Sequence, residues 1–121
     1  MHFDFITVYV ADMEASIRFY NGLLGLEVLR RHPIEDGELA FLGVDGQPTI
    51  EIISGPAFAD NTYNGFSIGI AVPSLDDATK RMEENGYPLV RGPISPNPSA
   101  RFSYFRDPHG IEVQLIEHIP H

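Results

Sequence analysis

Glu51 is the residue of this chain whose type and position best suit acid–base chemistry. It lies within residues 49–53, a short apolar and β-branched run that is typical of a strand. A carboxylate among apolar neighbours can remove a proton next to a substrate carbonyl, as a general base does. Alternatively, Glu51 accepts a hydrogen bond from Thr7 or Gln114, because a buried acid needs partners. The sequence leaves both roles open.

The surroundings of Glu51 occur twice in the chain. Residues 112–116 repeat the pattern of residues 49–53, and the second copy has Gln114 where the first has Glu51. Residues 10–16 and 72–78 form a second matching pair. A repeat at a nearly constant offset indicates a duplicated module. We expect matching positions to meet around a pseudo-twofold axis, where a site is most easily built.

The first half has the pattern of one strand, one helix and three further strands. Helical spacing of apolar residues begins after Asp12, a typical helix N-cap, and ends at Gly25. Asp45 and Gly46 form a strong hairpin signal. We expect the helical apolar positions at Met13, Ile17, Tyr20 and Leu24, and strands at 5–10, 26–31, 38–42 and 49–53.

The second half repeats this order. Ser74, with Asp77 three residues later, predicts a helix start, and Gly86 predicts its end. The prolines within residues 92–100 predict an irregular loop. We expect strands at 66–72, 89–91, 102–106 and 111–117.

Alternation along these strands separates a uniformly apolar face from a mixed face. We assign the apolar face to the side that the helices cover. The mixed face combines aromatic and polar groups, which suits a concave ligand cavity. Its members are Phe3, Phe5, Thr7 and Tyr9 in the first strand, Thr49, Glu51 and Ile53 in the fourth, and Ser67, Gly69, Ala71, Glu112, Gln114 and Ile116 in the second half.

Five aromatic residues admit two interpretations. They stack on a planar ligand in a pocket, or they pack in the core or at a dimer interface. These residues are Phe5, Tyr9, Phe41, Phe102 and Tyr104.

The composition excludes several classes of function. The chain has 121 residues, 43% of them hydrophobic, which is typical of a globular domain. A formal net charge of −9 argues against nucleic acid or an anionic membrane as the partner. The absence of cysteine excludes disulfides and thiolate chemistry. We find no secretory signal pattern at residues 1–4 and no apolar run that could span a bilayer, so we expect a cytoplasmic protein.

Motifs in both halves of the chain resemble those of the vicinal oxygen chelate superfamily, which includes glyoxalase I, extradiol dioxygenases and bleomycin-binding proteins. The resemblance covers nearly the whole chain. The motifs are Val10-Ala11-Asp12-Met13, Ser16-Ile17-Arg18-Phe19-Tyr20 and Leu24-Gly25-Leu26 in the first half, and Gly69-Ile70-Ala71-Val72 and Phe105-Arg106-Asp107-Pro108-His109-Gly110 in the second.

This resemblance implies an α+β fold of two βαβββ modules that form a curved, mixed β-sheet cup with helices outside. It also implies a homodimer. We expect a single domain over residues 1–121, with modules at 1–54 and 66–119 joined by 55–65. The modules pair within one chain or across the dimer, and the sequence does not distinguish these arrangements.

The resemblance also implies where a metal would bind in the metal enzymes of the family. The matching positions here are Phe5, Glu51, Ser67 and Gln114. Phe5 has no donor atom, the hydroxyl of Ser67 and the amide of Gln114 are weak neutral ligands, and only Glu51 is an ordinary ligand for a divalent cation. We therefore expect no native metal and no cofactor.

From these observations we expect a glyoxalase- or bleomycin-resistance-like protein that binds a small organic molecule in the cup. The expected ligand-binding residues are Phe5, Thr7, Ser67, Tyr104 and Gln114. One alternative is a lyase or isomerase, possibly metal-dependent and lactoylglutathione lyase-like or dioxygenase-like, in which Glu51 is the catalytic, proton-transferring base. Another is an interaction module without a ligand. Fold alone does not decide among them.

Overall fold

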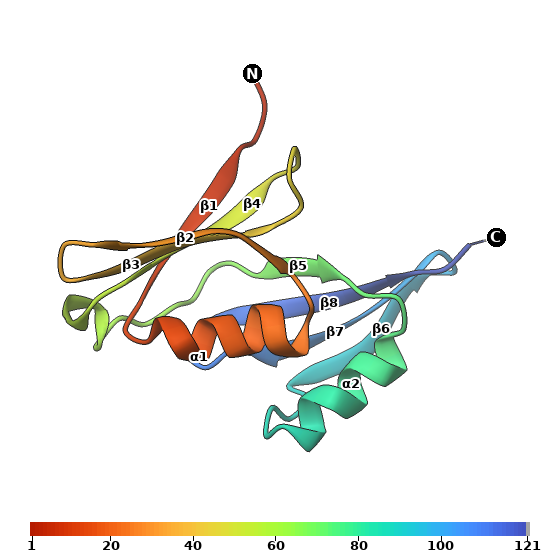
Figure 1. The fold of residues 1–121 in the computed structure, drawn as a ribbon. Coiled ribbons are helices and arrows are strands. Elements are labelled where there is room, and N and C mark those ends of the chain that lie inside the picture. Colours follow the sequence, from red (N-terminus) through yellow and green to blue (C-terminus); the bar gives the residue numbers. More distant parts are fainter. Residues whose placement is uncertain (121) are drawn as a thin grey trace. The chain divides into compact units, whose positions relative to one another are not determined.

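The protein is described here by a computed structural model that covers residues 1–120, and His121 lies outside the described residues. The chain divides into two compact units, Met1–Asn61 and Thr62–His121. Each unit contains the order strand, helix and three strands, as the repeat predicts (Figure 1). The fold class is α+β, as expected.

The first unit consists of a four-stranded sheet and the helical segments that follow β1 and β4. A short 3-10 helix lies in the connection that follows β4. The elements are β1 (Phe5–Val10), α1 (Met13–Ile17), η1 (Arg18–Leu23), β2 (Glu27–Ile34), β3 (Gly37–Gly43), β4 (Thr49–Ser54) and η2 (Pro56–Phe58).

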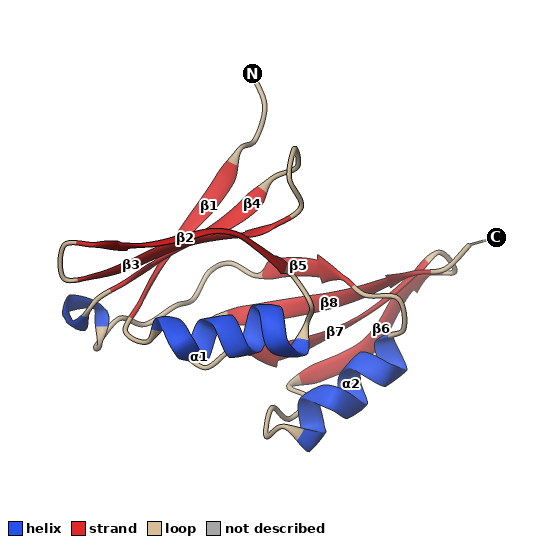
Figure 2. Cartoon of the chain, in the orientation of Figure 1, coloured by secondary structure: helices blue, strands red, loops and turns tan. Residues whose placement is uncertain are grey.

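The second unit has a sheet of the same design, with one helix against it. Figure 2 shows the strands of the units in red and the helical segments in blue. The elements are β5 (Ile68–Ala71), α2 (Leu75–Glu84), β6 (Arg91–Asn97), β7 (Ala100–Arg106) and β8 (Glu112–His118).

The two sheets have equivalent strand orders, β1-β4-β3-β2 and β5-β8-β7-β6. The first strand of each unit pairs in parallel with the last strand, and the remaining pairs are antiparallel. Parallel pairing needs a long crossover connection, which the helix and the two middle strands supply. This topology places Glu51 and Gln114 on central strands of their sheets.

The apolar faces of the strands form the cores, as alternation predicts. Helix α1 contacts β4, and α2 contacts β7 and β8. The opposite faces are half-buried or exposed, with Phe5 42% and Tyr9 44% exposed. The buried positions predicted by alternation are Val8, Val10, Ile50 and Ile52 in the first unit, and Ile68, Ile70, Val113 and Leu115 in the second.

The first helix differs from the regular α-helix that the apolar spacing predicts. It begins as predicted, with the Asp12 carboxylate accepting the Ala15 N–H bond at 3.1 Å. From Arg18 onward it becomes a π-helix, η1. The adjacent rings of Phe19 and Tyr20 are both buried in this segment, at 0% and 1% exposure. Sequence spacing therefore missed Phe19 as a core residue.

The second helix agrees closely with the sequence prediction. The Ser74 hydroxyl accepts a hydrogen bond from the Asp77 N–H group at 3.2 Å, which makes Ser74 the N-cap of α2. Gly86 follows the helix with a φ of 87°, in the left-handed region that favours glycine. Within the part of the chain that the structure describes, no helix is long and apolar enough to cross a membrane.

The segment around Pro93 and Pro96 corrects the prediction of an irregular loop for residues 92–100. Arg91–Asn97 is strand β6, at the edge of the second sheet. Proline is tolerated at an edge, because one side of the strand needs no N–H donor. The pairing with β7 is irregular, and its register shifts on both sides of Ile94.

Candidate functional site

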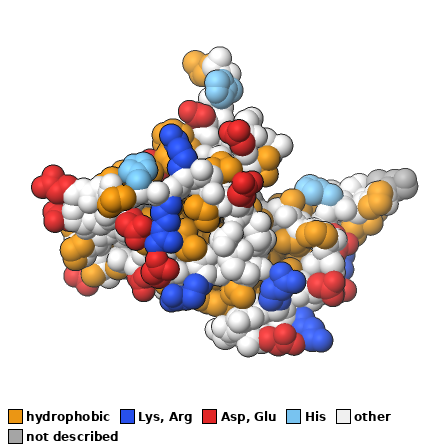
Figure 3. Space-filling view, in the orientation of Figure 1, with side chains coloured by type: hydrophobic (Ala, Val, Ile, Leu, Met, Phe, Trp, Pro, Cys, Tyr) orange, Lys and Arg blue, Asp and Glu red, His pale blue; other side chains and the backbone are white. Residues whose placement is uncertain are grey.

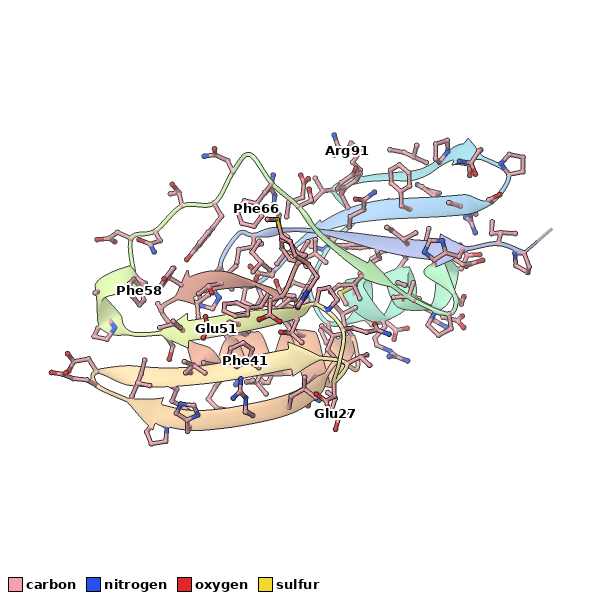
Figure 4. All side chains as sticks on the ribbon, turned by 90° about the horizontal axis from the view of Figure 1, so that it is seen from above. Glu27, Phe41, Glu51, Phe58, Phe66 and Arg91 are labelled. Carbon is pink, nitrogen blue, oxygen red and sulfur yellow. The ribbon has the colours of Figure 1, made fainter. Side chains whose placement is uncertain are left out.

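A row of four side chains crosses the mixed face of the first sheet. Strand register pairs Thr7 with Glu51, Glu51 with Phe41, and Phe41 with Arg30. Directly paired residues in adjacent strands place their side chains on the same face. The row therefore contains a hydroxyl, a carboxylate, an aromatic ring and a guanidinium group side by side. Figure 4 labels Phe41 and Glu51 of this row.

The carboxylate of Glu51 is held by its neighbour in the row. The Thr7 hydroxyl donates a hydrogen bond of 2.5 Å to Glu51 Oε1. Thr7 is one of the two partners that we expected for this acid. Among residues 1–120, no other group hydrogen-bonds to the Glu51 carboxylate, which leaves Oε2 available. The arrangement fixes one oxygen and presents the other to whatever occupies the face.

Arg30 covers the ring of Phe41, its neighbour in the row. Arg30 Cζ lies 4.5 Å from the centroid of the Phe41 ring, which is the geometry of a cation–π contact. Phe5 meets Phe41 edge to face, with ring centroids 5.4 Å apart. A cation and two rings thus form one continuous surface at the N-terminal end of β1.

This surface borders a cavity of about 980 Å³ in the first unit. Phe5, Arg30 and Phe41 line it, together with residues of the hairpin that joins β3 and β4. Of the predicted site residues in this unit, Phe5 lines the cavity, whereas Thr7 and Glu51 lie further along the same sheet face. The volume suits a small organic molecule.

The second sheet contains the corresponding row. Register pairs Gly69 with Gln114, Gln114 with Tyr104, and Tyr104 with Arg91. Arg91 Cζ lies 3.8 Å from the centroid of the Tyr104 ring. The cation–π contact of the first unit is thus present at the matching position of the second, where Figure 4 labels Arg91. Glu51 and Thr7 are replaced by an amide and by glycine.

Ser67, the remaining predicted ligand-binding residue, takes part in a charged cluster. Its hydroxyl donates a hydrogen bond to Glu112 Oε1. Arg91 approaches the same carboxylate to 3.8 Å and Arg106 to 3.6 Å. Gln114 lies on the same strand, and its side-chain amide forms no hydrogen bond within the part of the chain that the structure describes.

The four positions that bind metal in the family's metal enzymes do not fit a metal in this chain. Phe5 offers no atom that could coordinate a metal, and one oxygen of Glu51 accepts a hydrogen bond from Thr7. The Ser67 hydroxyl is directed to Glu112, and the Gln114 amide is neutral. Across residues 1–120, no group of three His, Cys, Asp or Glu residues is placed to hold a metal ion. Tight binding of a transition metal needs stronger and more numerous donors.

Two other residues considered in the sequence have structural roles. Tyr9 packs against Phe58 of η2, with ring centroids 5.1 Å apart. The N–H groups of His109 and Ile111 donate to the Asp107 carboxylate at 2.8 and 2.9 Å, which shapes the hairpin between β7 and β8. His109 thus belongs to a turn, and Asp107, only 5% exposed, is the structural acid that holds it.

Sequence reasoning missed Arg30 and Arg91. Phe41 and Tyr104 were named as candidates for the pocket, but the arginines lie on strands whose register the repeat does not fix. A bulge shifts the pairing between Val28 and Arg30. The available signal was that an arginine lies on the strand preceding each of these aromatics.

Comparisons with known proteins agree with this architecture. Residues 2–115 match the family model described as the Glyoxalase/Bleomycin resistance protein/Dioxygenase superfamily. The lactoylglutathione lyase of Salmonella typhimurium is 31% identical, over 89% of this chain and 86% of that protein. A probable lactoylglutathione lyase of Synechocystis is 27% identical, over 91% of this chain and 90% of that protein.

Solved structures show the same fold. A glyoxalase family protein from Bacillus cereus gives a TM-score of 0.83 at 22% identity, covering 99% of this chain and 95% of that one. TnmS3, an antibiotic binding protein from Streptomyces, gives 0.74 at 22% identity, covering 98% of this chain and 96% of that one. At these identities the likeness concerns the fold alone.

Proposed function

We propose, from the premise that this chain belongs to the Glyoxalase/Bleomycin resistance protein/Dioxygenase superfamily, that it binds a small organic molecule without using a metal. The observation that carries this proposal is the cavity of about 980 Å³ beside Phe5, Arg30 and Phe41. Three phenylalanines, Phe3, Phe5 and Phe41, line it beside polar and charged side chains, and a concave site with both kinds of group suits a small organic molecule. In the second unit, the unbonded Gln114 amide and the Tyr104 ring are suited to orient a ligand.

Metal analysis tests the metal-free part of the proposal. The purified protein is incubated with manganese, iron, cobalt, nickel and zinc, desalted, and measured by elemental analysis. We expect no stoichiometric retention, because the donor set is poor. Near-stoichiometric retention of one metal, lost in Glu51→Ala, would overturn the proposal.

A melting-temperature screen tests the binding part. A ligand that binds only the folded state raises the melting temperature with its concentration. We expect at least one compound of a panel of metabolites and antibiotics to do so, and Phe5→Ala to reduce the rise. If no compound has an effect, the chain is better described as an interaction module.

A second candidate function is a lyase or isomerase reaction with Glu51 as the base. The half-buried carboxylate, fixed by Thr7 at one oxygen and unbonded at the other, favours it. The lactoylglutathione lyases among the relatives favour it too. Glu51→Gln should abolish turnover of lactoylglutathione while the fold stays intact. If the mutant loses only ligand affinity, the catalytic role is excluded.

We also propose that the protein is a cytoplasmic homodimer and that modules 1–54 and 66–119, joined by 55–65, work as one domain. The resemblance of the sequence to the family supports this organisation. Light scattering after size-exclusion chromatography tests the dimer, since a mass near 13.5 kDa would indicate a monomer.

A further inference from the structure

Each unit places an arginine over an aromatic ring, and the two pairs occupy matching positions. In the first unit Arg30 covers Phe41 at 4.5 Å, and in the second Arg91 covers Tyr104 at 3.8 Å. Each aromatic ring lies beside the central residue of its row, Glu51 or Gln114. The rings and central residues have changed identity between the modules, whereas the arginines have not.

The two arginines differ in what they contact besides the ring. Arg91 has a carboxylate, Glu112, within 3.8 Å. Within residues 1–120, the side chain of Arg30 forms neither an ion pair nor a hydrogen bond. Its neighbour Arg31 is engaged by both Glu14 and Glu38. Arg30 is therefore a stacked guanidinium whose donors are all available.

The contact with the ring prepares this group to bind a planar anion. It restricts the movement of the guanidinium, whose N–H groups form a planar fork. This fork matches the two oxygens of a carboxylate, and less side-chain freedom remains to be lost on binding. The rings of Phe5 and Phe41 then offer an apolar surface to the part of the ligand behind its carboxylate.

The charges around the cavity limit the ligand further. Asp4, Glu27 and Asp45 line the same cavity as Arg30. None of these carboxylates forms an ion pair with Arg30, because each lies more than 4 Å from its guanidinium nitrogens. A second negative charge on the ligand would face these carboxylates and be repelled. The cavity thus accepts one carboxylate at Arg30 and disfavours a dianion.

We propose that Arg30, stacked on Phe41, binds the carboxylate of an aromatic monocarboxylate in the cavity of the first unit. This inference rests on the proposed function, since it names the class of molecule that the site binds. Arg91 is the corresponding stacked group in the second unit, where Glu112 already occupies part of its surroundings.

The test compares three small probes that differ in charge. Benzoate, its neutral analogue benzamide and the dianion isophthalate are titrated into ¹⁵N-labelled protein, and the Arg30 Nε–Hε and Phe41 amide resonances are followed. We expect benzoate to bind about tenfold more tightly than benzamide, since a charged bidentate pair is lost with the amide. Isophthalate should bind more weakly than benzoate.

Variants assign the charge preference to Arg30. Arg30→Gln should bind benzoate and benzamide equally, and Arg30→Lys should retain only part of the preference, because ammonium lacks the planar fork. Arg18→Gln is the matched control, since Arg18 is exposed in the same unit and forms no ion pair within residues 1–120. It should behave as wild type.

The outcomes separate this inference from the proposed function. If benzoate and benzamide shift the same cavity resonances with equal affinity, Arg30 recognises no anion, while the cavity still binds organic molecules. If isophthalate binds as tightly as benzoate, the restriction to monocarboxylates is wrong. If neither benzoate nor benzamide shifts any cavity resonance, the inference fails, and the melting-temperature screen decides whether the proposed function fails with it.

Discussion

Thr7 and Glu51 lie directly opposite each other on the parallel strands β1 and β4, and the threonine hydroxyl donates to the carboxylate at 2.5 Å. The bond joins the two strands that are furthest apart in the sequence of the first unit. It also decides which oxygen of Glu51 remains available.

Removing this hydroxyl should destabilise the first unit. Thr7→Val keeps the shape of the side chain but leaves Glu51 Oε1 without its donor, which costs about 1 kcal/mol in the free energy of unfolding. Urea denaturation measures the difference. Thr49→Val is the matched control, because its hydroxyl makes no hydrogen bond within residues 1–120. Equal losses in the two variants would mean that the Thr7–Glu51 bond contributes nothing.

The pair Arg31–Glu38 predicts a local pH dependence. Arg31 Nε donates to Glu38 Oε2 at 2.8 Å, and this bond lowers the pKa of Glu38 below its ordinary value of 4.5. The ion pair therefore stabilises the folded state fully above pH 4.5, and this contribution is lost as the pH falls through the lowered pKa of Glu38. In Arg31→Gln, carboxyl NMR titration should show the Glu38 pKa moving upward. An unchanged value would contradict the assignment.

Substitution by alanine should lower the stability of the fold at Gly37 and raise it at Gly22. A Cβ at Gly37 would lie 1.7 Å from the carbonyl oxygen of Ser54, so Gly37→Ala should destabilise by about 1–3 kcal/mol. A Cβ at Gly22 meets nothing within 4 Å, and the residue is helical. Gly22→Ala should stabilise by about 0.5–1 kcal/mol. The melting temperatures of the two variants measure the difference. If both variants melt above, or both below, the wild-type protein, the predicted Cβ contacts do not decide their stability.

The N-cap of α2 provides a fourth prediction. Ser74→Ala removes the acceptor for the Asp77 N–H group, which should cost about 1 kcal/mol of stability. Ser95→Ala, at an exposed position of β6, serves as the control and should change stability by less than about 0.5 kcal/mol. Chemical denaturation followed by circular dichroism measures both. If Ser95→Ala is the more harmful change, the cap is not what stabilises this helix.

The sequence was sufficient to predict the duplicated module and most of its elements. Strand alternation identified the buried faces because one face of each sheet is almost purely apolar. The caps at Asp12 and Ser74 were predicted because their side chains act within three residues of their own position. These are local signals, or signals repeated at a nearly constant offset.

Features that depend on register or on departures from a regular period were missed. The apolar spacing did not predict the π-helix η1, and it selected Tyr20 but not Phe19, which is equally buried. Strand β6 was hidden by prolines that only an edge position tolerates. Arg30 and Arg91 reach their rings through cross-strand pairing, which a bulge and register shifts disturb.

The prolines of β6 also bear on how the folded protein behaves at high concentration. An unpaired sheet edge presents N–H and C=O groups that can template a strand from another molecule. Pro93 and Pro96 have no N–H group to offer, and the edge strand β2 likewise carries Pro33. Figure 3 shows charged side chains interspersed with the hydrophobic ones on the visible surface. At β2 and β6, these prolines disfavour the addition of a strand from another molecule.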